Sequence, residues 1–185
     1  VERAKESDIL NQLSLQPGQY GVVTLHRPAN VDDKEVLDSL LKVLIDISTD
    51  LPLVFPIHPR TKSRLEAFGL MEKLESAENI SCLGPAGYND FLCLTSQAKV
   101  IVTDSGGLQE ESTALGVPCL TMRPNTERPI TVTEGTSTLV GSDAAKLKFH
   151  LTEVIDGTYK SSRCPELWDG KAAERIAEIL AAEAG

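Results

Sequence analysis

Short runs of Val, Ile and Leu alternate along the chain with segments of helical periodicity, and this alternation limits the possible folds most strongly. The runs are mostly continuous, which is typical of strands buried on both faces of a parallel sheet. Helices between such strands cover the two faces. We therefore predict an α/β fold, a Rossmann-like three-layer α/β/α domain. The expected strands are residues 20–25, 53–57, 79–83, 100–103, 119–122 and 137–140. The expected helices are residues 32–49, 61–68, 88–98, 108–115, 144–155 and 167–182, with one turn at 129–133.

The 185 residues fit one domain with a sizeable core. Only 4% of them are aromatic, so we expect the core to consist of Leu, Ile, Val and Ala. The chain opens on Val1 with a helical pattern, and residues 1–17 are expected to be a linker helix that enters from something upstream. Residues 169–185 are assigned to a C-terminal helix, and residues 156–168 form the longest irregular segment.

The formal net charge of −9 argues against two kinds of partner. An acidic surface repels both nucleic acid and anionic membranes, so we expect neither. If the ligand is an anion, the site must supply local positive charge. No apolar run is long enough to span a membrane, and residues 1–30 do not have the pattern of a secretory signal.

The cysteine pattern favours a reducing compartment. Four cysteines are present without any CxxC or CxxH spacing, and three of them lie in apolar runs. Buried reduced thiols in a cytoplasmic protein are the favoured interpretation, and a metal site is the less favoured alternative. The cysteines are Cys82, Cys93, Cys119 and Cys164.

Polar side chains follow three of the expected strands, at the edge where ligands bind in parallel sheets. His26 and Arg27 follow the first strand, His58 follows the second, and a Ser105-Gly106-Gly107 segment follows the fourth. A single histidine at such a place is more often structural. Two histidines at equivalent strand ends make a shared site about as probable as the structural alternative.

The Ser105-Gly106-Gly107 segment lies between a strand and a helix. Two glycines allow a ligand close to the backbone, and the helix start offers free N–H groups and the positive end of the helix dipole, which suits phosphate. The alternative is an ordinary Ser-capped helix. The sequence has neither a GxGxxG nor a GxxxxGK[ST] motif, so neither the dinucleotide fingerprint nor the P-loop fingerprint applies.

Other polar and aromatic residues near this edge suit a nucleotide. Glu110 and Glu111 follow the glycines, and a carboxylate there can accept hydrogen bonds from a ribose diol, although two solvated acids are an alternative. Arg123 and Arg128 flank the loop after the next strand, and guanidinium groups bind anions in pairs of hydrogen bonds. Tyr88 or Phe91 could stack on a base or pack in the core. The combined basic edge indicates a diphosphate ligand.

A series of motifs in this order resembles the C-terminal half of the non-hydrolysing UDP-N-acetylglucosamine 2-epimerases. The resemblance extends from about residue 20 to residue 179, and its DSGG…TERP block is specific. The motifs are HRPANVD (26–32), PIHPR (56–60), DSGGLQEESTALGVP (104–118), MRPNTERP (122–129), EGTSTLVG (134–141) and DGKAAERI (169–176).

The resemblance implies a GT-B fold, in which two Rossmann-like domains enclose the active site and this chain supplies the UDP-binding half. It implies that the full-length enzyme, a homodimer, interconverts UDP-GlcNAc and UDP-ManNAc. A proton leaves C2, UDP leaves C1, and re-addition to the glucal intermediate inverts C2. No metal, nicotinamide or other cofactor is implied. The C2 acid/base carboxylates and a catalytic Lys belong to the N-terminal half, so the chain alone is expected to be inactive.

The resemblance also assigns roles to individual residues. His26 is the catalytic candidate, near the leaving diphosphate. Ser105 and the Gly106 and Gly107 backbone would hold the diphosphate, and Arg128 would add a cation. His58 would lie between the substrate site and a second, activating UDP-GlcNAc. The remaining substrate-binding candidates are Arg27, Phe91 against the uracil, and Glu111 on the ribose.

One departure from the family pattern leaves the exact sugar open. Pro28-Ala29-Asn30 follows Arg27, where many bacterial members have a second Arg and a Glu. An epimerase for a UDP-diacetamido-glucuronate is therefore an alternative. A GT-B glycosyltransferase domain, a hydrolysing epimerase and a binding module that senses UDP-sugars without chemistry are further alternatives.

Overall fold

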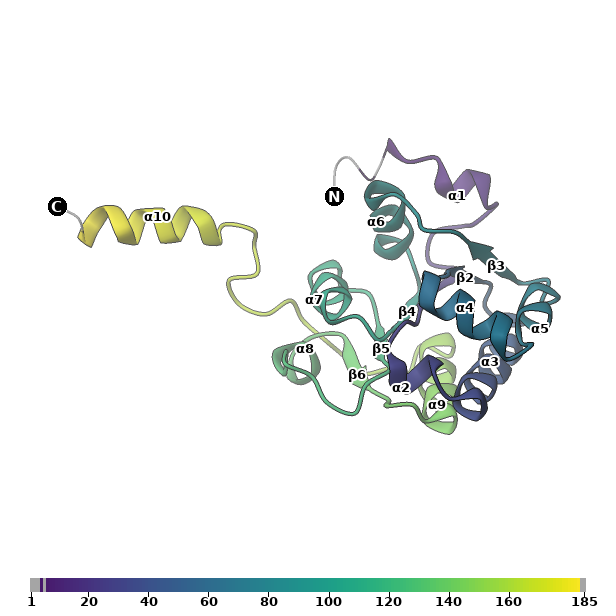
Figure 1. Ribbon diagram of the computed structural model, residues 1–185. Helices are drawn as coiled ribbons and strands as arrows, with labels where there is room; N and C mark the ends of the chain where they lie inside the picture. Colours follow the sequence, from purple (N-terminus) through teal and green to yellow (C-terminus); the bar gives the residue numbers. More distant parts are fainter. Residues whose placement is uncertain (1–3, 5, 184–185) are drawn as a thin grey trace.

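The fold is a six-stranded, fully parallel sheet between two layers of helices (Figure 1). A computed structural model describes residues 4 and 6–183. The strand order is β3-β2-β1-β4-β5-β6, so the predicted Rossmann-like α/β/α architecture is confirmed. The strands are β1 Gly21–Thr24, β2 Leu53–Pro56, β3 Ile80–Leu83, β4 Val100–Thr103, β5 Cys119–Thr121 and β6 Ser137–Leu139.

The two faces of the sheet pack against different helices. Val23 and Val102 face a core completed by α3 and α9, whereas Val22 and Ile101 face a core completed by α6 and α7. Burial on both faces explains why these strands have continuous apolar sequences. The helices are α1 Ile9–Gln12, α2 Pro28–Val31, α3 Lys34–Ser48, α4 Pro59–Ala67, α5 Met71–Glu75, α6 Tyr88–Ser96, α7 Gly106–Leu115, α8 Ile130–Thr133, α9 Ala144–Ile155 and α10 Ala172–Glu183.

Local capping explains where several helices begin and end. The Asp33 side chain accepts a hydrogen bond from the Val36 backbone N–H, so one of the two predicted caps of α3 is confirmed. The His58 side chain caps α4, which therefore begins at Pro59 and not at the predicted residue 61. Helix α7 ends at Gly116, whose φ of +73° favours glycine.

Four other helical regions differ from the prediction. Helices α2 and α5 are single short turns that periodicity cannot reveal. Among the described residues 4 and 6–17, only α1 is an α-helix, and residues 1–3 and 5 of the predicted linker helix lie outside the described part of the chain. The C-terminal helix begins at Ala172 and not at residue 167, because Leu167 and Gly170 both have positive φ.

Helix α10 extends away from the sheet at the end of an irregular segment (Figure 1). Ile176, Ile179 and Leu180 are exposed on it. Within the described ranges, no helix combines the length and the apolar character that a bilayer crossing needs. All four cysteines are free: Cys93 and Cys119 are buried, Cys82 is half-buried and Cys164 is exposed, so the prediction of buried thiols is wrong for Cys164.

The strand order indicates at which point of the sheet a ligand would bind. Strand β1 pairs with β2 on one side and with β4 on the other, so the chain reverses its direction of winding between β1 and β4. In open α/β sheets, ligands bind beyond the carboxyl ends of the strands at this switch point. The residues after Thr24 and after Thr103 meet there.

The packing of Gly135 generates a stability prediction. A Cβ atom on Gly135 would lie 2.5 Å from Thr113 Oγ1 and 2.7 Å from the Thr131 carbonyl oxygen, so α8 could not stay this close to α7. Gly135→Ala should therefore lower the free energy of unfolding by about 1–3 kcal/mol in urea titrations. Gly84→Ala is the matched control, because its Cβ would have no atom within 4 Å. Equal stability of the two variants would contradict the tight α7–α8 packing.

Candidate functional site

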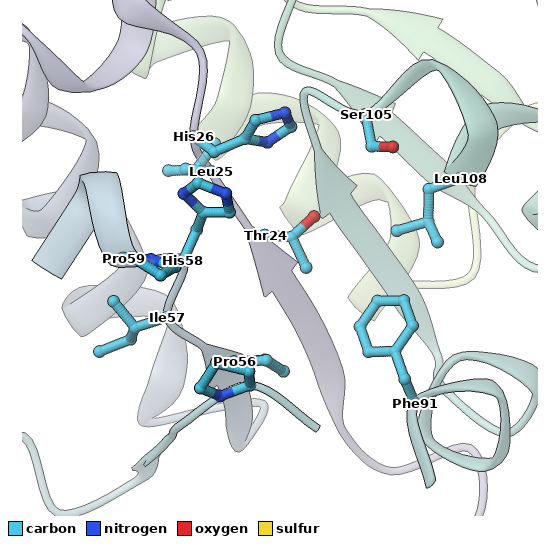
Figure 2. A pocket seen from close by; sticks show the side chains of 11 residues that line it. Thr24, Leu25, His26, Pro56, Ile57, His58, Pro59, Phe91, Ser105 and Leu108 are labelled. Carbon is cyan, nitrogen blue, oxygen red and sulfur yellow. The ribbon is translucent and has the colours of Figure 1, made fainter. Parts of the chain in front are cut away.

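A cavity of about 250 Å³ lies beyond the carboxyl ends of β1 and β2, next to the start of α7. Figure 2 shows His26 and His58 on one side of this cavity, with Phe91, Ser105 and Leu108 across from them. The cavity therefore unites residues that are far apart in the sequence and that follow different strands. Its lining is Thr24, Leu25, His26, Pro56, Ile57, His58, Pro59, Pro85, Phe91, Ser105 and Leu108.

Asp104 joins the ends of the two central strands. Its side chain is fully buried directly after β4. Oδ2 accepts hydrogen bonds from the backbone N–H groups of His26 (2.9 Å) and Arg27 (2.8 Å) and from Asn30 Nδ2 (2.9 Å). Oδ1 lies 2.6 Å from Nδ1 of the His26 ring. This set of donors fixes the turn that follows β1 and the orientation of His26.

Asn30 and Arg27 complete this connection. Besides Asp104, the buried Asn30 Nδ2 donates to the Met122 carbonyl oxygen, and Asn30 Oδ1 accepts from Ser142 Oγ. Arg27 Nε donates to the Asp104 carbonyl oxygen at 2.9 Å. Arg27 therefore holds the turn through the Nε of its guanidinium group.

His58 is held from the opposite side of the cavity. Its Nδ1 accepts a hydrogen bond of 3.1 Å from the Arg60 backbone N–H at the start of α4. The Arg60 guanidinium in turn binds Asp32, and this hydrogen bond lowers the pKa of the Asp32 carboxyl group. The centroids of the His26 and His58 rings are 5.2 Å apart. The two imidazoles therefore share one wall.

The start of α7 combines backbone N–H groups and guanidinium groups, which are features that suit an anion. The Ser105 backbone N–H donates to Thr103 Oγ1, and the Ser105 hydroxyl group does not cap the helix. The first N–H groups of a helix lack intrahelical acceptors, so the amides of Gly106 and Gly107 are available to a ligand. A Cβ atom on Gly106 would lie 2.7 Å from Arg128 Nη1 and 3.6 Å from Arg123 Nη1. The glycine therefore brings the helix terminus next to two guanidinium groups.

These two arginines have carboxylate partners that leave part of their charge unpaired. Arg123 is only 5% exposed, and its Nη2 binds Glu127 Oε1 at 2.7 Å, but within residues 6–183 its buried Nη1 has no hydrogen-bond partner. Arg128 Nε lies 2.7 Å from Glu110 Oε2. The hydrogen bond from Arg123 is the main reason why the pKa of Glu127 falls to about 2. An anion at the helix terminus would meet positive charge on two sides.

Glu111 does not line the cavity of Figure 2. It lies one turn after Gly107 on the same face of α7 and borders a second hollow with Glu110 and Trp168. Burial, with a smaller contribution from the charge of Glu110, raises the pKa of Glu111. Because no ion pair between described residues involves Glu111, its acceptor atoms remain available.

The structure brings together some, but not all, of the predicted site residues. His26, His58, Phe91 and Ser105 line one cavity, and Gly106 and Arg128 adjoin it at the start of α7. Gly107 is exposed beside them, whereas Arg27 and Glu111 do not line this cavity, and Glu111 borders the second hollow. Tyr88, the aromatic alternative to Phe91, is 69% exposed and does not line the cavity.

Two residues of the site were not predicted as functional. Asp104 and Asn30 occur inside the quoted motifs, but their sequence gives no sign of the donors that surround them. Arg123 was predicted as an anion contact with Arg128, but its burial was not expected. Within residues 6–183, no group of three or more His, Cys, Asp or Glu side chains is arranged to hold a metal ion.

Comparison with known proteins agrees with the resemblance inferred from the motifs. The family model described as UDP-N-acetylglucosamine 2-epimerase matches residues 1–181. The epimerase of Methanocaldococcus jannaschii is 44% identical over 163 residues, which are 87% of this chain and 44% of that protein. The UDP-2,3-diacetamido-2,3-dideoxy-D-glucuronate 2-epimerase of Pseudomonas aeruginosa is 36% identical over 176 residues, 91% of this chain and 46% of that protein.

A solved structure gives the same result. The M. jannaschii UDP-GlcNAc 2-epimerase in complex with UDP-GlcNAc and UDP superimposes with a TM-score of 0.83 at 40% identity. The match covers 98% of this chain and 50% of that one. The chain thus spans about half the length of the relatives it matches. It belongs to the UDP-N-acetylglucosamine 2-epimerase family.

Proposed function

We propose that this chain is the UDP-sugar-binding half of an enzyme that interconverts UDP-GlcNAc and UDP-ManNAc by elimination and re-addition of UDP. The observation that carries the proposal is the start of α7 at the β1/β4 switch point. Free helix amides, the Ser105 hydroxyl group and the partly unpaired charges of Arg123 and Arg128 converge there. In a chain of net charge −9, this concentration of positive charge suits a diphosphate.

The nucleoside end of the ligand would extend along α7. Glu111 lies one turn beyond the proposed diphosphate position, where its carboxylate can accept hydrogen bonds from the ribose hydroxyl groups. Phe91 lines the cavity from α6 and offers an apolar ring to the uracil. Arg27 adds positive charge at the margin of the site.

The sugar end would face the two histidines. His26, in its imidazolium form, would act as the acid that protonates the diphosphate oxygen as the bond to C1 breaks. His58 faces the same space and would also contact a second UDP-GlcNAc molecule. The groups that remove and return the C2 proton would come from an N-terminal domain, so the chain alone is inactive. We further propose that the full-length enzyme is a homodimer in the cytoplasm, in line with the free cysteines.

A UDP-diacetamido-glucuronate is the second candidate substrate. The P. aeruginosa relative named for this sugar is 36% identical to the chain. Residues 28–30 also differ from the Arg and Glu found in many bacterial epimerases that act on UDP-GlcNAc.

The first prediction from this proposed function concerns UDP binding. Isothermal titration should detect weak binding of UDP to this chain, because half of the site is missing. Glu111→Gln should weaken that binding roughly ten- to hundredfold, since a lost hydrogen bond to a charged group costs about 1.5–3 kcal/mol. Glu178→Gln on α10 is the matched control and should bind like the wild type. Unchanged affinity of Glu111→Gln would refute the ribose role.

A second prediction concerns the stability of the same variant. The raised pKa of Glu111 means that the folded state disfavours the charged carboxylate. The contribution of Glu111 to the free energy of unfolding is therefore lost as the pH rises through the pKa of the folded state. Glu111→Gln removes this penalty. The variant should be more stable than wild type towards urea at neutral pH, and the difference should shrink in mild acid. A less stable variant at neutral pH would indicate a structural role for Glu111.

A third prediction concerns activity. The full-length protein, given UDP-GlcNAc and no acceptor, should form UDP-ManNAc. His26→Gln should slow this reaction about 10²–10⁴-fold, whereas His150→Gln, which lies outside the cavity, should not. Turnover that requires an acceptor would support a glycosyltransferase and contradict the proposal. Release of free ManNAc would support a hydrolysing epimerase, turnover only of UDP-diacetamido-glucuronate would support the second substrate, and no chemistry would support a sensor.

A further inference from the structure

We propose that the fold holds His26 and His58 in opposite neutral tautomers. The cavity then receives an unprotonated, proton-accepting Nε2 from His26 and a proton-bearing Nε2–H donor from His58. The chemical meaning of this arrangement rests on the proposed function, but the tautomers follow from hydrogen bonds to groups behind the two rings.

The partner of His26 is a carboxylate that can only accept. Asp104 Oδ1 lies 2.6 Å from His26 Nδ1, and Oδ2 already receives three N–H donors. A buried carboxylate surrounded by donors in this way is ionised and requires a hydrogen on the facing ring nitrogen. His26 therefore carries its proton on Nδ1, and when neutral it has a lone pair on Nε2.

The partner of His58 is a backbone N–H that can only donate. His58 Nδ1 accepts from the Arg60 amide at 3.1 Å and serves as the N-terminal cap of α4. A ring nitrogen that accepts a hydrogen bond cannot carry a proton, so the proton of neutral His58 is on Nε2.

Both rings line one cavity. They line the same wall, with centroids 5.2 Å apart and a tilt of 38° between the planes (Figure 2). His26 Nε2 can take a proton and return it while Asp104 remains as the counter-ion. His58 can only donate a hydrogen bond to an oxygen of the ligand. Asp104 is therefore a positioning residue for His26, and the Arg60 amide has the corresponding role for His58.

Nitrogen NMR can test this inference directly, because the chain has only three histidines. Long-range ¹H–¹⁵N spectra of the labelled chain, at a pH where imidazoles are neutral, distinguish the two tautomers. We expect His26 to be the Nδ1–H form and His58 the Nε2–H form. The variants His26→Gln, His58→Gln and His150→Gln assign the signals. Both cavity rings in the same tautomer, or a mixture at His26, would overturn the inference.

Asp104→Asn adds a test of the cause. The new amide can present an N–H to His26 Nδ1, so His26 should change to the Nε2–H form while His58 stays unchanged. An unchanged His26 in a folded variant would remove the positioning role of Asp104. If this variant does not fold, the wild-type spectrum still decides the tautomers.

The tautomer spectra and the UDP titration test two different claims, and each can fail without the other. A chain that binds UDP but has both rings in one tautomer overturns this inference alone. A chain with opposite tautomers that does not bind UDP at high concentration overturns the proposed function and leaves the tautomer assignment intact.

Discussion

The buried carboxylate of Asp104 is the interaction on which the site depends most. It follows β4, yet its donors come from the turn after β1 and from the first helix beyond that turn. Because β1 and β4 are neighbours at the switch point, this one side chain fixes the two loops between which a ligand would bind. A buried carboxylate without hydrogen-bond donors would destabilise the fold, so the four donors are what allow Asp104 to be buried here.

Electrostatics at the same edge oppose the charge of the whole chain. The net charge is −9, but Arg27, Arg123 and Arg128 gather around the start of α7. Glu110 and Glu127 neutralise part of this charge, and one buried nitrogen of Arg123 has no hydrogen-bond partner among the described residues. Guanidinium groups beside the positive end of a helix dipole repel one another. A bound diphosphate would relieve this repulsion, so the site would favour an anion as its ligand.

The sequence predicts those parts of the molecule that depend on regular patterns. Continuous apolar runs identify the parallel strands, and strand ends identify His26, His58 and Ser105 as neighbours in space. The helical turn α2 could not be predicted, because Pro28 and the donors to Asp104 create it without periodicity. The burial of Arg123 could not be predicted either, because arginine is a residue type that is mostly exposed.

Amide chemical shifts in the presence of UDP test the central claim that the start of α7 holds a diphosphate. The account predicts that a ¹H–¹⁵N titration gives the largest saturable shifts at Gly106 and Gly107, with smaller ones at Phe91 and Glu111. Shifts centred on another hollow, such as the one lined by Lys62 and Cys82, would contradict the account. The absence of any shift at millimolar UDP would contradict it as well.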